Sequence, residues 1–408
     1  MKRVVITGTG AICAIGTDVS SFYQALLAAR SGITMHEFPW GSSLVARVAA
    51  DIDAPFPKMR RIAYDRVTQL ALLATGQALA QSGLERLGTP LHASGIYWGT
   101  GMGGAQTLEQ TYRDLYVEHA GRVRPMTIVA AMNNAPAAQI AIELGIQGPS
   151  HTYSSACSSS AVAIGEAYRA ICFGFVPMAI VGGAEALLTE GVVKAWQSLH
   201  TLATPDPARP ETSSRPFAAD RSGFVLGEGA ATLILEDHDA ARARGATILA
   251  EIIGYANTTD ARHIAQPDIT GQAAAMSQAI AAAGLEPAHI QYVNAHGTGT
   301  KVGDLVETRA IRAVFGPSAQ ALAISATKAL HGHLMGATGA LEMVALVETL
   351  RNRVVPPTAH LAHADIECDL DYVAEGSRAM PGLDVAMTNS FGFGGNNVSL
   401  IARRYPHR

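Results

Sequence analysis

The sequence predicts an α/β fold built from two similar halves, and three observations support this. Apolar runs typical of buried strands alternate with segments of helical period along the whole chain. The chain has 408 residues, which is too long for one simple domain and suits two packed halves. Hydrophobic residues make up 48% of it and charged residues only 16%, as in a protein with a large buried core.

Within the first half, three strand-like runs are separated by helical segments. These runs are "RVVITGTG" (3–10), "GIYWGTG" (95–101) and "MAIVGGAEA" (178–186). Between the first two, residues 66–82 have the period of a helix. Because strands that alternate with helices usually lie parallel and buried, we predict a largely parallel sheet.

The second half repeats this pattern. Its strand-like runs are "QYVNAHGTGT" (291–300), "ALAISATKA" (321–329) and "VAMTNSFGFGG" (385–395), with helical stretches at 271–283 and 334–351. The two halves lack strict periodicity, which argues against a solenoid and leaves a structural duplication open.

The boundary between the halves is predicted near residue 250. Residues 201–222 are rich in Pro and polar residues and are predicted to form a long surface loop. We therefore expect an N-terminal half at 1–250 and a C-terminal half at 251–408.

Charge, hydropathy and cysteine usage exclude several classes of protein. The formal charge of −4 provides no basic field for nucleic acid, and no apolar run is long enough to span a membrane. The first residues run directly into a strand pattern without a signal peptide. The four cysteines are scattered and form no C-x-x-C pair, which argues against a disulfide framework or structural zinc. We expect a cytoplasmic enzyme with reduced thiols.

Cys157 lies where a β-prone run meets a helical pattern. Ala161, Ile164, Tyr168 and Ile171 recur on one helical face, so Cys157 lies at or near the N-terminus of that helix. Free N–H groups and the helix dipole at such a position favour a thiolate and can also receive an oxyanion. The three serines that follow Cys157 are small enough for a thioester to approach. A buried structural cysteine is the alternative interpretation.

Two histidines follow strand-like runs in the second half. "NAHGTGT" (294–300) contains His296, and "SATKALHGHLMGATGALE" (325–342) contains His333 together with Lys328 and Glu342. Open α/β sheets place their chemistry at the carboxyl ends of strands. His331 and His333 form H-x-H, but no carboxylate or cysteine follows at ligand spacing, so we predict no metal site.

Glycine-rich segments add one candidate loop and two segments that imitate a nucleotide-binding motif. "NSFGFGGNN" (389–397) alternates glycine with Phe391 and Phe393 and can shape an apolar pocket. "GTGAIC" (8–13) lacks the third glycine of a dinucleotide fingerprint, and "GTGMGG" (99–104) matches it without a clear βαβ unit. Turns and close packing explain these glycines better than nucleotide binding does.

Taken together, these motifs resemble the β-ketoacyl-acyl-carrier-protein synthases, in their elongating type I/II branch. The motifs are "SSACSSS", "NAHGTGT", "TKALHGHLMGATG" and "NSFGFGG", and the similarity runs essentially end to end. The use of two histidines separates the chain from the chain-initiating and chalcone-type relatives. The resemblance implies the thiolase fold, in which two duplicated α/β halves form a five-layered αβαβα sandwich that is normally dimeric.

The resemblance also implies a set of catalytic roles. Cys157 is expected to attack the acyl thioester of a carrier protein and to form the oxyanion hole with the backbone N–H of Phe393. His296 and His333, both neutral, are expected to donate hydrogen bonds to the thioester carbonyl of a malonyl-carrier. Lys328, with Glu342 as its ion partner, is expected to orient the site, and a purely structural ion pair is the alternative.

Further positions are implied to bind the substrate. Thr298 and Thr300 match positions that contact phosphopantetheine, together with Phe391 and the gating Phe393. The acyl pocket is expected to include Met102 and Trp196. Departures from the family pattern suggest a specialised acyl range; they occur at 122–134, which looks shortened, and at Ser158–Ser160, Trp196, Ala265–Gln266, Gly299 and Asn396.

Basic side chains are implied to dock the acidic acyl carrier protein, with solvated surface charge as the alternative. They are Lys58, Arg60, Arg61, Arg66, Arg122 and Arg124. No cofactor is expected beyond the phosphopantetheine of the carrier.

Three hypotheses of function follow. The first is fatty-acid chain elongation, and the second is a ketosynthase for polyketide or polyene chains that pairs with a chain-length subunit. The third is a non-condensing partner subunit, against which Cys157 and both histidines argue. The sequence does not reveal chain length, saturation or the oligomeric partner.

Overall fold

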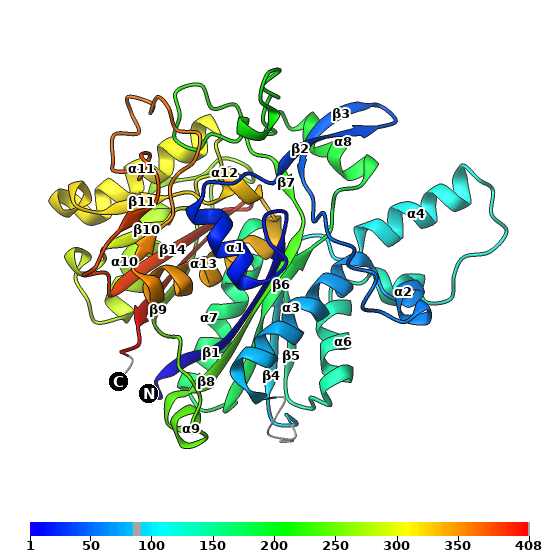
Figure 1. Cartoon of the computed structure of the whole chain (residues 1–408), viewed down its shortest axis with the longest axis horizontal. Helices are drawn as coiled ribbons and strands as arrows, with labels where there is room; N and C mark the ends of the chain where they lie inside the picture. The colour runs from blue at the N-terminus through cyan, green and yellow to red at the C-terminus, as the bar shows by residue number, and fades with distance from the viewer. Residues whose placement is uncertain (85–90, 407–408) are drawn as a thin grey trace.

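A ten-stranded mixed sheet forms the framework of the protein (Figure 1). The structure is a computed structural model that describes residues 1–84 and 91–406. The strand order is β11-β10-β14-β15-β9-β1-β8-β6-β4-β5. The strands are β1 (Val4–Cys13), β4 (Gly95–Gly99), β5 (Ser150–Tyr153), β6 (Met178–Glu185), β8 (Gly229–Asp237), β9 (Ala250–Thr259), β10 (Tyr292–Asn294), β11 (Ala323–Ser325), β14 (Val385–Gly392) and β15 (Asn396–Arg404).

Two halves of the sheet have the same topology. Read outward from the β1–β9 pair, the orders are β1-β8-β6-β4-β5 and β9-β15-β14-β10-β11. If the five strands of each half are numbered in sequence order, both halves have the spatial order 1-5-4-2-3, with strand 1 innermost. The halves join where Val4–Ile6 pair with Ala250–Ile252. The predicted duplication is confirmed, whereas the boundary at residue 250 between separate domains stays a prediction.

The prediction of a largely parallel sheet is wrong in the middle of the sheet. Strands β6, β4 and β5 are mutually parallel, as are β14, β10 and β11. All pairs from β6 across to β14 are antiparallel. Strands β8, β9 and β15 were not among the predicted strands, and each of these lies in the antiparallel centre. An alternation of strands and helices in the sequence indicates only strands that are joined by crossover helices. It therefore does not indicate these three antiparallel strands.

Helices form three layers around the two halves of the sheet. α3 (Arg66–Ser82) and α6 (Ala135–Leu144) cover the outer face of one half, and α10 (Ile269–Ala282) and α11 (Lys301–Phe315) cover the outer face of the other. α7 (Ser159–Cys172) and α13 (Thr338–Asn352) pack together in the middle (Figure 1). Every residue of α13 from Thr338 to Leu350 is buried. This is the predicted αβαβα sandwich.

Shorter elements complete the described part of the chain. They are α1 (Val19–Leu27), β2 (Ile33–Phe38), β3 (Gly41–Ala46), α2 (Lys58–Ala63), α4 (Ala105–Tyr116), α5 (Thr127–Ala131), α8 (Glu190–Ser198), β7 (Leu226–Gly227), α9 (His238–Ala243), α12 (Lys328–His331), β12 (Val354–Val355) and β13 (Arg378–Ala379). None of the helices in residues 1–84 and 91–406 is both long and apolar enough to cross a membrane.

The segment at 201–222 is the predicted surface loop only in its first part, where most residues from 204 to 211 are exposed. Its second part is buried, with Phe217 at 0% exposure. Arg221 lies 2% exposed between two carboxylates of the C-terminal half, with Nη1 2.7 Å from Asp365 and Nε 3.7 Å from Asp304. Arg221 therefore forms a buried ionic contact that binds the second part of this segment to the C-terminal half.

Candidate functional site

Cys157 lies on a strained turn between β5 and α7. A 3₁₀ turn, Ala156–Ser158, precedes the helix, and Ala156 has a φ of 50°, a value that L-residues rarely adopt. Close packing holds this turn: a Cβ on Gly99 would lie 2.2 Å from Ser160 N, and one on Gly392 would lie 2.8 Å from Ser155 O. The predicted position next to a helix N-terminus is confirmed.

The three serines after Cys157 are structural. All three are fully buried. Ser158 donates to Ser155 O at 2.9 Å and Ser159 donates to Ala156 O at 2.6 Å, which fixes the turn. Ser160 accepts from Ala340 N at 2.9 Å and so links α7 to α13. Ser158 and Ser159 therefore stabilise the turn that carries Cys157, and Ser160 joins the two central helices.

The expectation of a thiolate at Cys157 is wrong for the free protein. Burial raises the pKa of the thiol to about 11, although Lys328 and the backbone N–H groups of Phe393 and Cys157 itself act to lower it. Desolvation outweighs the helix terminus because the thiol is only 5% exposed. The same two N–H groups lie next to Sγ, which is where the predicted oxyanion hole requires them.

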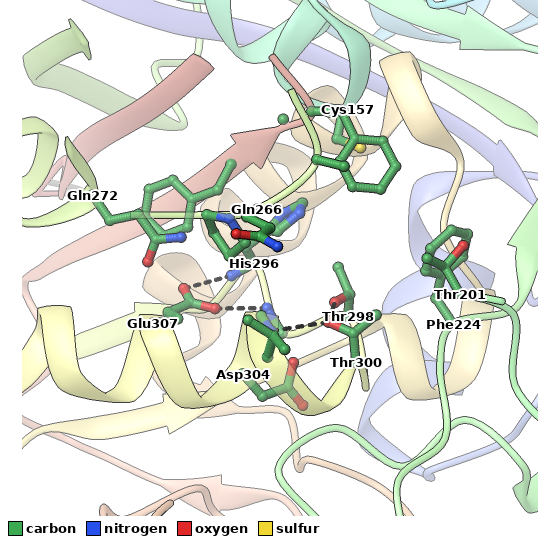
Figure 2. Close-up of a pocket in the computed structure, with 18 of the residues that line it drawn as sticks. Cys157, Thr201, Phe224, Gln266, Gln272, His296, Thr298, Thr300, Asp304 and Glu307 are labelled. Atoms are coloured by element: carbon green, nitrogen blue, oxygen red, sulfur yellow. Dashed lines mark hydrogen bonds between the residues drawn. The ribbon is translucent and has the colours of Figure 1, made fainter. Parts of the chain in front are cut away.

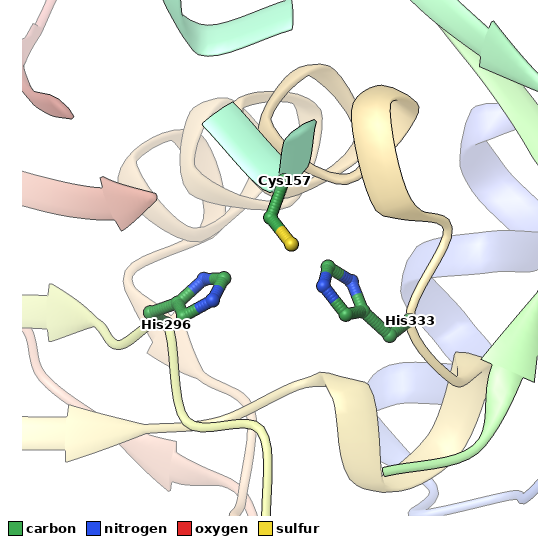
Figure 3. A group of neighbouring side chains, drawn as sticks. All are labelled: Cys157, His296 and His333. Carbon is green, nitrogen blue, oxygen red and sulfur yellow. The ribbon is translucent and has the colours of Figure 1, made fainter. Parts of the chain in front are cut away.

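His296 and His333 face Cys157 from the other half of the chain (Figure 3). Their rings lie edge to face with centroids 5.5 Å apart. The sulfur and one ring nitrogen of each histidine all lie within 4.8 Å of one another. Burial, followed by the charge of Lys328, holds the pKa of both rings well below the usual value. Both are therefore neutral, and the predicted absence of a metal here stays a prediction.

Separate backbone contacts hold each histidine. Glu307 accepts hydrogen bonds from His296 N and Gly297 N, each at 2.8 Å (Figure 2). The peptide of His333 is bonded on both sides, donating to Val225 O at 2.7 Å and accepting from Gly227 N at 2.9 Å. The backbones of the two histidines are thus held by different parts of the chain, that of His296 by α11 and that of His333 by residues 225–227, which include β7.

Lys328 and Glu342 form a buried ion pair beneath the histidines. Nζ lies 2.5 Å from Glu342 Oε1, and the two side chains are 1% and 0% exposed. Burial raises the pKa of Glu342 to about 7, although Lys328 opposes this shift. Nζ also donates to His296 O at 2.5 Å. Lys328 therefore contacts the main chain of His296 and acts on both rings through its charge.

A cavity of about 530 Å³ connects these groups to the surface. Figure 2 shows Thr298 and Thr300 on its wall, with their hydroxyls 3.0 Å apart. Phe391 and Phe393 line it as predicted. Ala265 and Gln266, where departures from the family pattern occur, also line it.

Met102 and Trp196 do not line this cavity. Trp196 stacks on Phe393 with ring centroids 5.9 Å apart and contacts Phe224 edge to face at 5.6 Å. Met102 is 43% exposed. Their assignment to an acyl pocket stays a prediction.

Buried carboxylates that the sequence analysis missed support the site. Glu185 accepts from Gly101 N at 2.7 Å and Met102 N at 3.0 Å, and so occupies the N–H groups that a phosphate would need in "GTGMGG". Asp304 accepts from Phe217 N and Gly299 N at 2.7 and 3.0 Å. Burial raises the pKa of Glu185 and Asp304 to about 7. The sequence signal for such buried carboxylates is an acidic residue inside an otherwise apolar or glycine-rich run.

Five of the six predicted docking cations are exposed, and Arg66 is not among them. Lys58, Arg60 and Arg61 lie on α2, and Arg122 and Arg124 follow α4. The side chain of Arg66 is 17% exposed and forms bonds of 2.9 and 2.6 Å to the buried carboxylate of Glu228. The prediction for Arg66 is corrected, because its charge is already neutralised inside the protein.

Comparison with known proteins agrees with this geometry. Residues 1–241 match the family described as "Beta-ketoacyl synthase, N-terminal domain" and residues 249–362 match "Beta-ketoacyl synthase, C-terminal domain". The chain is 41% identical over 407 residues to "Nodulation protein E" of Rhizobium meliloti (strain 1021), covering 99% of both chains. It is 37% identical over 411 residues to "3-oxoacyl-[acyl-carrier-protein] synthase 2" of Staphylococcus aureus (strain N315), again covering 99% of both.

A solved structure shares the fold over its full length. "The ishigamide ketosynthase/chain length factor" superposes with a TM-score of 0.91 at 30% identity, covering 99% of this chain and 100% of that one. With two family domains matched in sequence order and a buried cysteine between two neutral histidines, the chain belongs to the β-ketoacyl synthase family of condensing acyltransferases.

Proposed function

We propose that the protein is a β-ketoacyl-acyl-carrier-protein synthase that elongates acyl chains by decarboxylative Claisen condensation, as in fatty-acid synthesis. An acyl chain held on Cys157 would react with malonyl-carrier protein to give a β-ketoacyl-carrier two carbons longer. The observation that carries this proposal is the placement of Cys157, next to two backbone N–H donors and between two neutral histidines.

Acyl transfer to Cys157 is the first step. The sulfur attacks the thioester carbonyl of an acyl-carrier, and the N–H groups of Cys157 and Phe393 stabilise the oxyanion. The carbon–sulfur bond to the carrier breaks, and the phosphopantetheine sulfur leaves as a thiol with the proton from Cys157. Because the pKa of about 11 keeps the cysteine a thiol in the free protein, its proton has to be transferred during this step.

Decarboxylation of the malonyl group is the second step. The bond between the malonyl C2 and its carboxylate breaks, CO₂ leaves, and the electron pair moves onto the thioester oxygen as an enolate. Neutral His296 and His333 donate hydrogen bonds to that oxygen, and these strengthen as negative charge develops. A neutral imidazole can donate one such bond, so the lowered pKa values are compatible with this role.

Condensation completes the cycle. The enolate carbon attacks the acyl group on Cys157, a carbon–carbon bond forms, and the carbon–sulfur bond to Cys157 breaks. The released sulfur takes up one proton and regenerates the thiol. Lys328 and Glu342 would keep His296 in place and both rings neutral, since Lys328 binds His296 O.

Substrate binding would use the walls of the cavity. Thr298 and Thr300 would offer paired hydroxyls to the phosphopantetheine arm, and Phe391 and Phe393 line the same cavity as Cys157. Trp196 would support the gate by stacking on Phe393, with Met102 as a further wall of the acyl pocket. We propose no cofactor beyond the phosphopantetheine that the carrier brings, and a cytoplasmic location.

Acyl carrier protein and a second ketosynthase-like subunit are the proposed partners. The exposed cations Lys58, Arg60 and Arg61 on α2, with Arg122 and Arg124, would dock the acidic carrier. β5 is the terminal strand of the sheet, and exposed apolar side chains lie on the nearby segment that contains α5. A free edge beside apolar surface supports a homodimer or a heterodimer with a related chain.

A second candidate function is favoured by one comparison. The similarity to a ketosynthase/chain length factor supports a role in a type II polyketide or polyene pathway, with aryl or unsaturated chains and a chain-length subunit as partner. The catalytic steps would be the same, and only the acyl chain and the partner would differ.

Intact-protein mass spectrometry with a panel of acyl-carrier proteins tests the proposal and separates its two forms. The panel would contain saturated, polyunsaturated, aryl and β-keto chains. We expect an acyl adduct on the wild type and on Cys172→Ala, whose thiol does not line the cavity, but not on Cys157→Ala. A preference for saturated chains supports fatty-acid elongation, and a preference for unsaturated or aryl chains supports the second function. An adduct that persists in Cys157→Ala would refute the assignment of the nucleophile.

A further inference from the structure

The side chain of Thr338 contacts a catalytic histidine, and this contact has a chemical consequence. Its Oγ1 lies 2.9 Å from His333 Nδ1, and both residues are 1% exposed. Thr338 is the first residue of α13 and follows the turn Met335–Ala337, in which Met335 has a φ of 44°. The strained turn brings the start of the helix back to the ring five residues earlier.

The direction of this hydrogen bond determines which nitrogen of His333 carries the proton. A neutral imidazole has one N–H donor and one lone-pair acceptor, and a threonine hydroxyl can take either role. If Thr338 donates, Nδ1 is the acceptor and the proton is on Nε2. If Nδ1 donates, Nε2 presents only a lone pair to the cavity, and His333 cannot donate to a carbonyl.

Burial decides between the two directions. Within the described residues, His333 Nδ1 is the sole hydrogen-bond partner of the Thr338 hydroxyl. If Nδ1 were the donor, the hydroxyl hydrogen and the Nε2 lone pair would both be buried without partners. If Thr338 is the donor, only Nε2–H is unpaired, and it faces the side of the ring where a substrate carbonyl would lie. The second arrangement leaves fewer unsatisfied groups and is favoured.

Apart from Thr338, no contact of His333 among the described residues determines which ring nitrogen carries the proton. Its peptide is held at N and O by Val225 and Gly227, which fixes the backbone but not the ring proton. Phe224 contacts the ring edge to face at 5.4 Å and offers no acceptor. Nε2 has no partner among the described residues. His296 differs, since its Nδ1 has no comparable partner there.

We propose that Thr338 is a positioning residue that holds His333 in the Nε2-protonated tautomer, so that His333 is the committed hydrogen-bond donor to the malonyl thioester. The inference rests on the proposed condensing function. The two histidines then differ in one respect. The tautomer of His333 is fixed by a side chain, whereas the tautomer of His296 can change when the substrate binds.

Two measurements test this proposal. Solid-state ¹⁵N spectra of protein labelled in histidine, with His333→Gln to assign the signals, should show the wild-type Nδ1 unprotonated and Nε2 protonated. In Thr338→Val, which removes the hydroxyl at nearly constant volume, the signals should shift toward a mixture of tautomers. Loss of one neutral hydrogen bond should lower kcat for malonyl-carrier decarboxylation by about tenfold, with little change in KM.

Matched variants separate positioning from folding. Thr338→Ser retains the hydroxyl and should recover most of the rate. Thr68→Val removes a buried hydroxyl on α3 that has no partner among the described residues, and it should leave the rate unchanged. In the His333→Gln background, Thr338→Val should cause no further loss, because the ring that it positions is gone.

The outcomes distinguish failure of this inference from failure of the proposed function. A wild-type protein that does not decarboxylate malonyl-carrier would overturn the proposed function. Normal wild-type decarboxylation combined with a protonated Nδ1 would overturn the role of Thr338. A decarboxylation rate for Thr338→Val equal to that of the wild type would also overturn the role of Thr338. The same holds if Thr338→Val lowers the rate equally in the wild-type and His333→Gln backgrounds. If Thr338→Val does not fold, the wild-type spectrum and Thr338→Ser still decide.

Discussion

At the residue scale, the protonation state of Cys157 is decided by burial. The helix terminus, the N–H groups of Phe393 and Cys157, and the charge of Lys328 all favour a thiolate. Desolvation of a thiol that is 5% exposed opposes them and prevails. Sequence reasoning identified the helix end but not the depth of burial, because burial depends on Gly392 and Phe224, which are far away in the chain.

The raised pKa of Cys157 predicts how its reactivity depends on pH. With a pKa of about 11, the thiolate fraction of the free protein rises about tenfold per pH unit between pH 7 and 10. The rate of alkylation by iodoacetamide, followed by intact mass with Cys157→Ala to subtract other thiols, should rise in proportion. A rate that is already constant by pH 8 would show that a thiolate is present in the free protein and would contradict this account.

The buried ion pair predicts a stability effect that depends on which partner is removed. Lys328→Met leaves Glu342 buried without a cation, which should destabilise the protein by about 3–5 kcal/mol. Lys328→Met/Glu342→Gln removes both charges and should recover much of that loss. Urea unfolding measures both variants. If the single variant were as stable as the double variant, removing the cation alone would carry no cost, which would contradict this prediction.

At the element scale, helix–sheet packing explains why some predictions succeeded. α3 spans the predicted residues 66–82, because Asp65 caps one end and Gly83, with a φ of 73°, ends the other. α13 begins four residues later than predicted, since the 3₁₀ turn at Met335–Ala337 interrupts its apolar pattern. Capping residues and helical periodicity thus predicted where helices lie. The 3₁₀ turn was not predictable, because distant contacts hold it.

The glycines of "GTGAIC" have a packing role that can be tested. A Cβ on Gly10 would lie 2.0 Å from Ala74 O, because α3 lies directly on β1. We predict that Gly10→Ala destabilises the protein by about 1–3 kcal/mol, as in overpacked cores. Gly76→Ala is the matched control: nothing lies within 4 Å of its added Cβ in mid-helix, so it should stabilise the protein by about 0.5–1 kcal/mol. Equal thermal shifts of the two variants would contradict the packing argument.

At the scale of the whole molecule, the site exists because the two halves are joined. Cys157 belongs to the N-terminal half and both histidines belong to the C-terminal half, and the central helices α7 and α13 bring them together. The resemblance predicted the composition of this site, and the spacing of motifs predicted its place at strand ends. An acid within an apolar, glycine-containing run indicated that Glu185 is buried. The contacts of Glu185, Glu307 and Thr338 were not predictable, because they depend on how turns bring these side chains to their partners.

The exposed cations of α2 predict a dependence on the carrier protein. Lys58→Ser/Arg61→Ser should lower kcat/KM for acyl-carrier substrates about tenfold at low salt, because electrostatic attraction speeds encounter. It should not change kcat/KM for the same acyl group on free pantetheine. Lys2→Ser, near the N-terminus and away from α2 in Figure 1, is the control that removes a surface cation elsewhere. Equal losses with both substrates would place these residues in folding rather than docking.

A single-turnover experiment tests the central claim most directly. Cys157 is first loaded from a saturated acyl-carrier, and the adduct is confirmed by intact mass. Malonyl-carrier with a ¹³C-labelled carboxylate is then added, and protein, carrier and CO₂ are followed together. We expect the adduct to disappear as one labelled CO₂ is released per β-ketoacyl-carrier formed, with a chain two carbons longer. Release of CO₂ while the adduct remains on Cys157, or a product formed without any adduct, would contradict it.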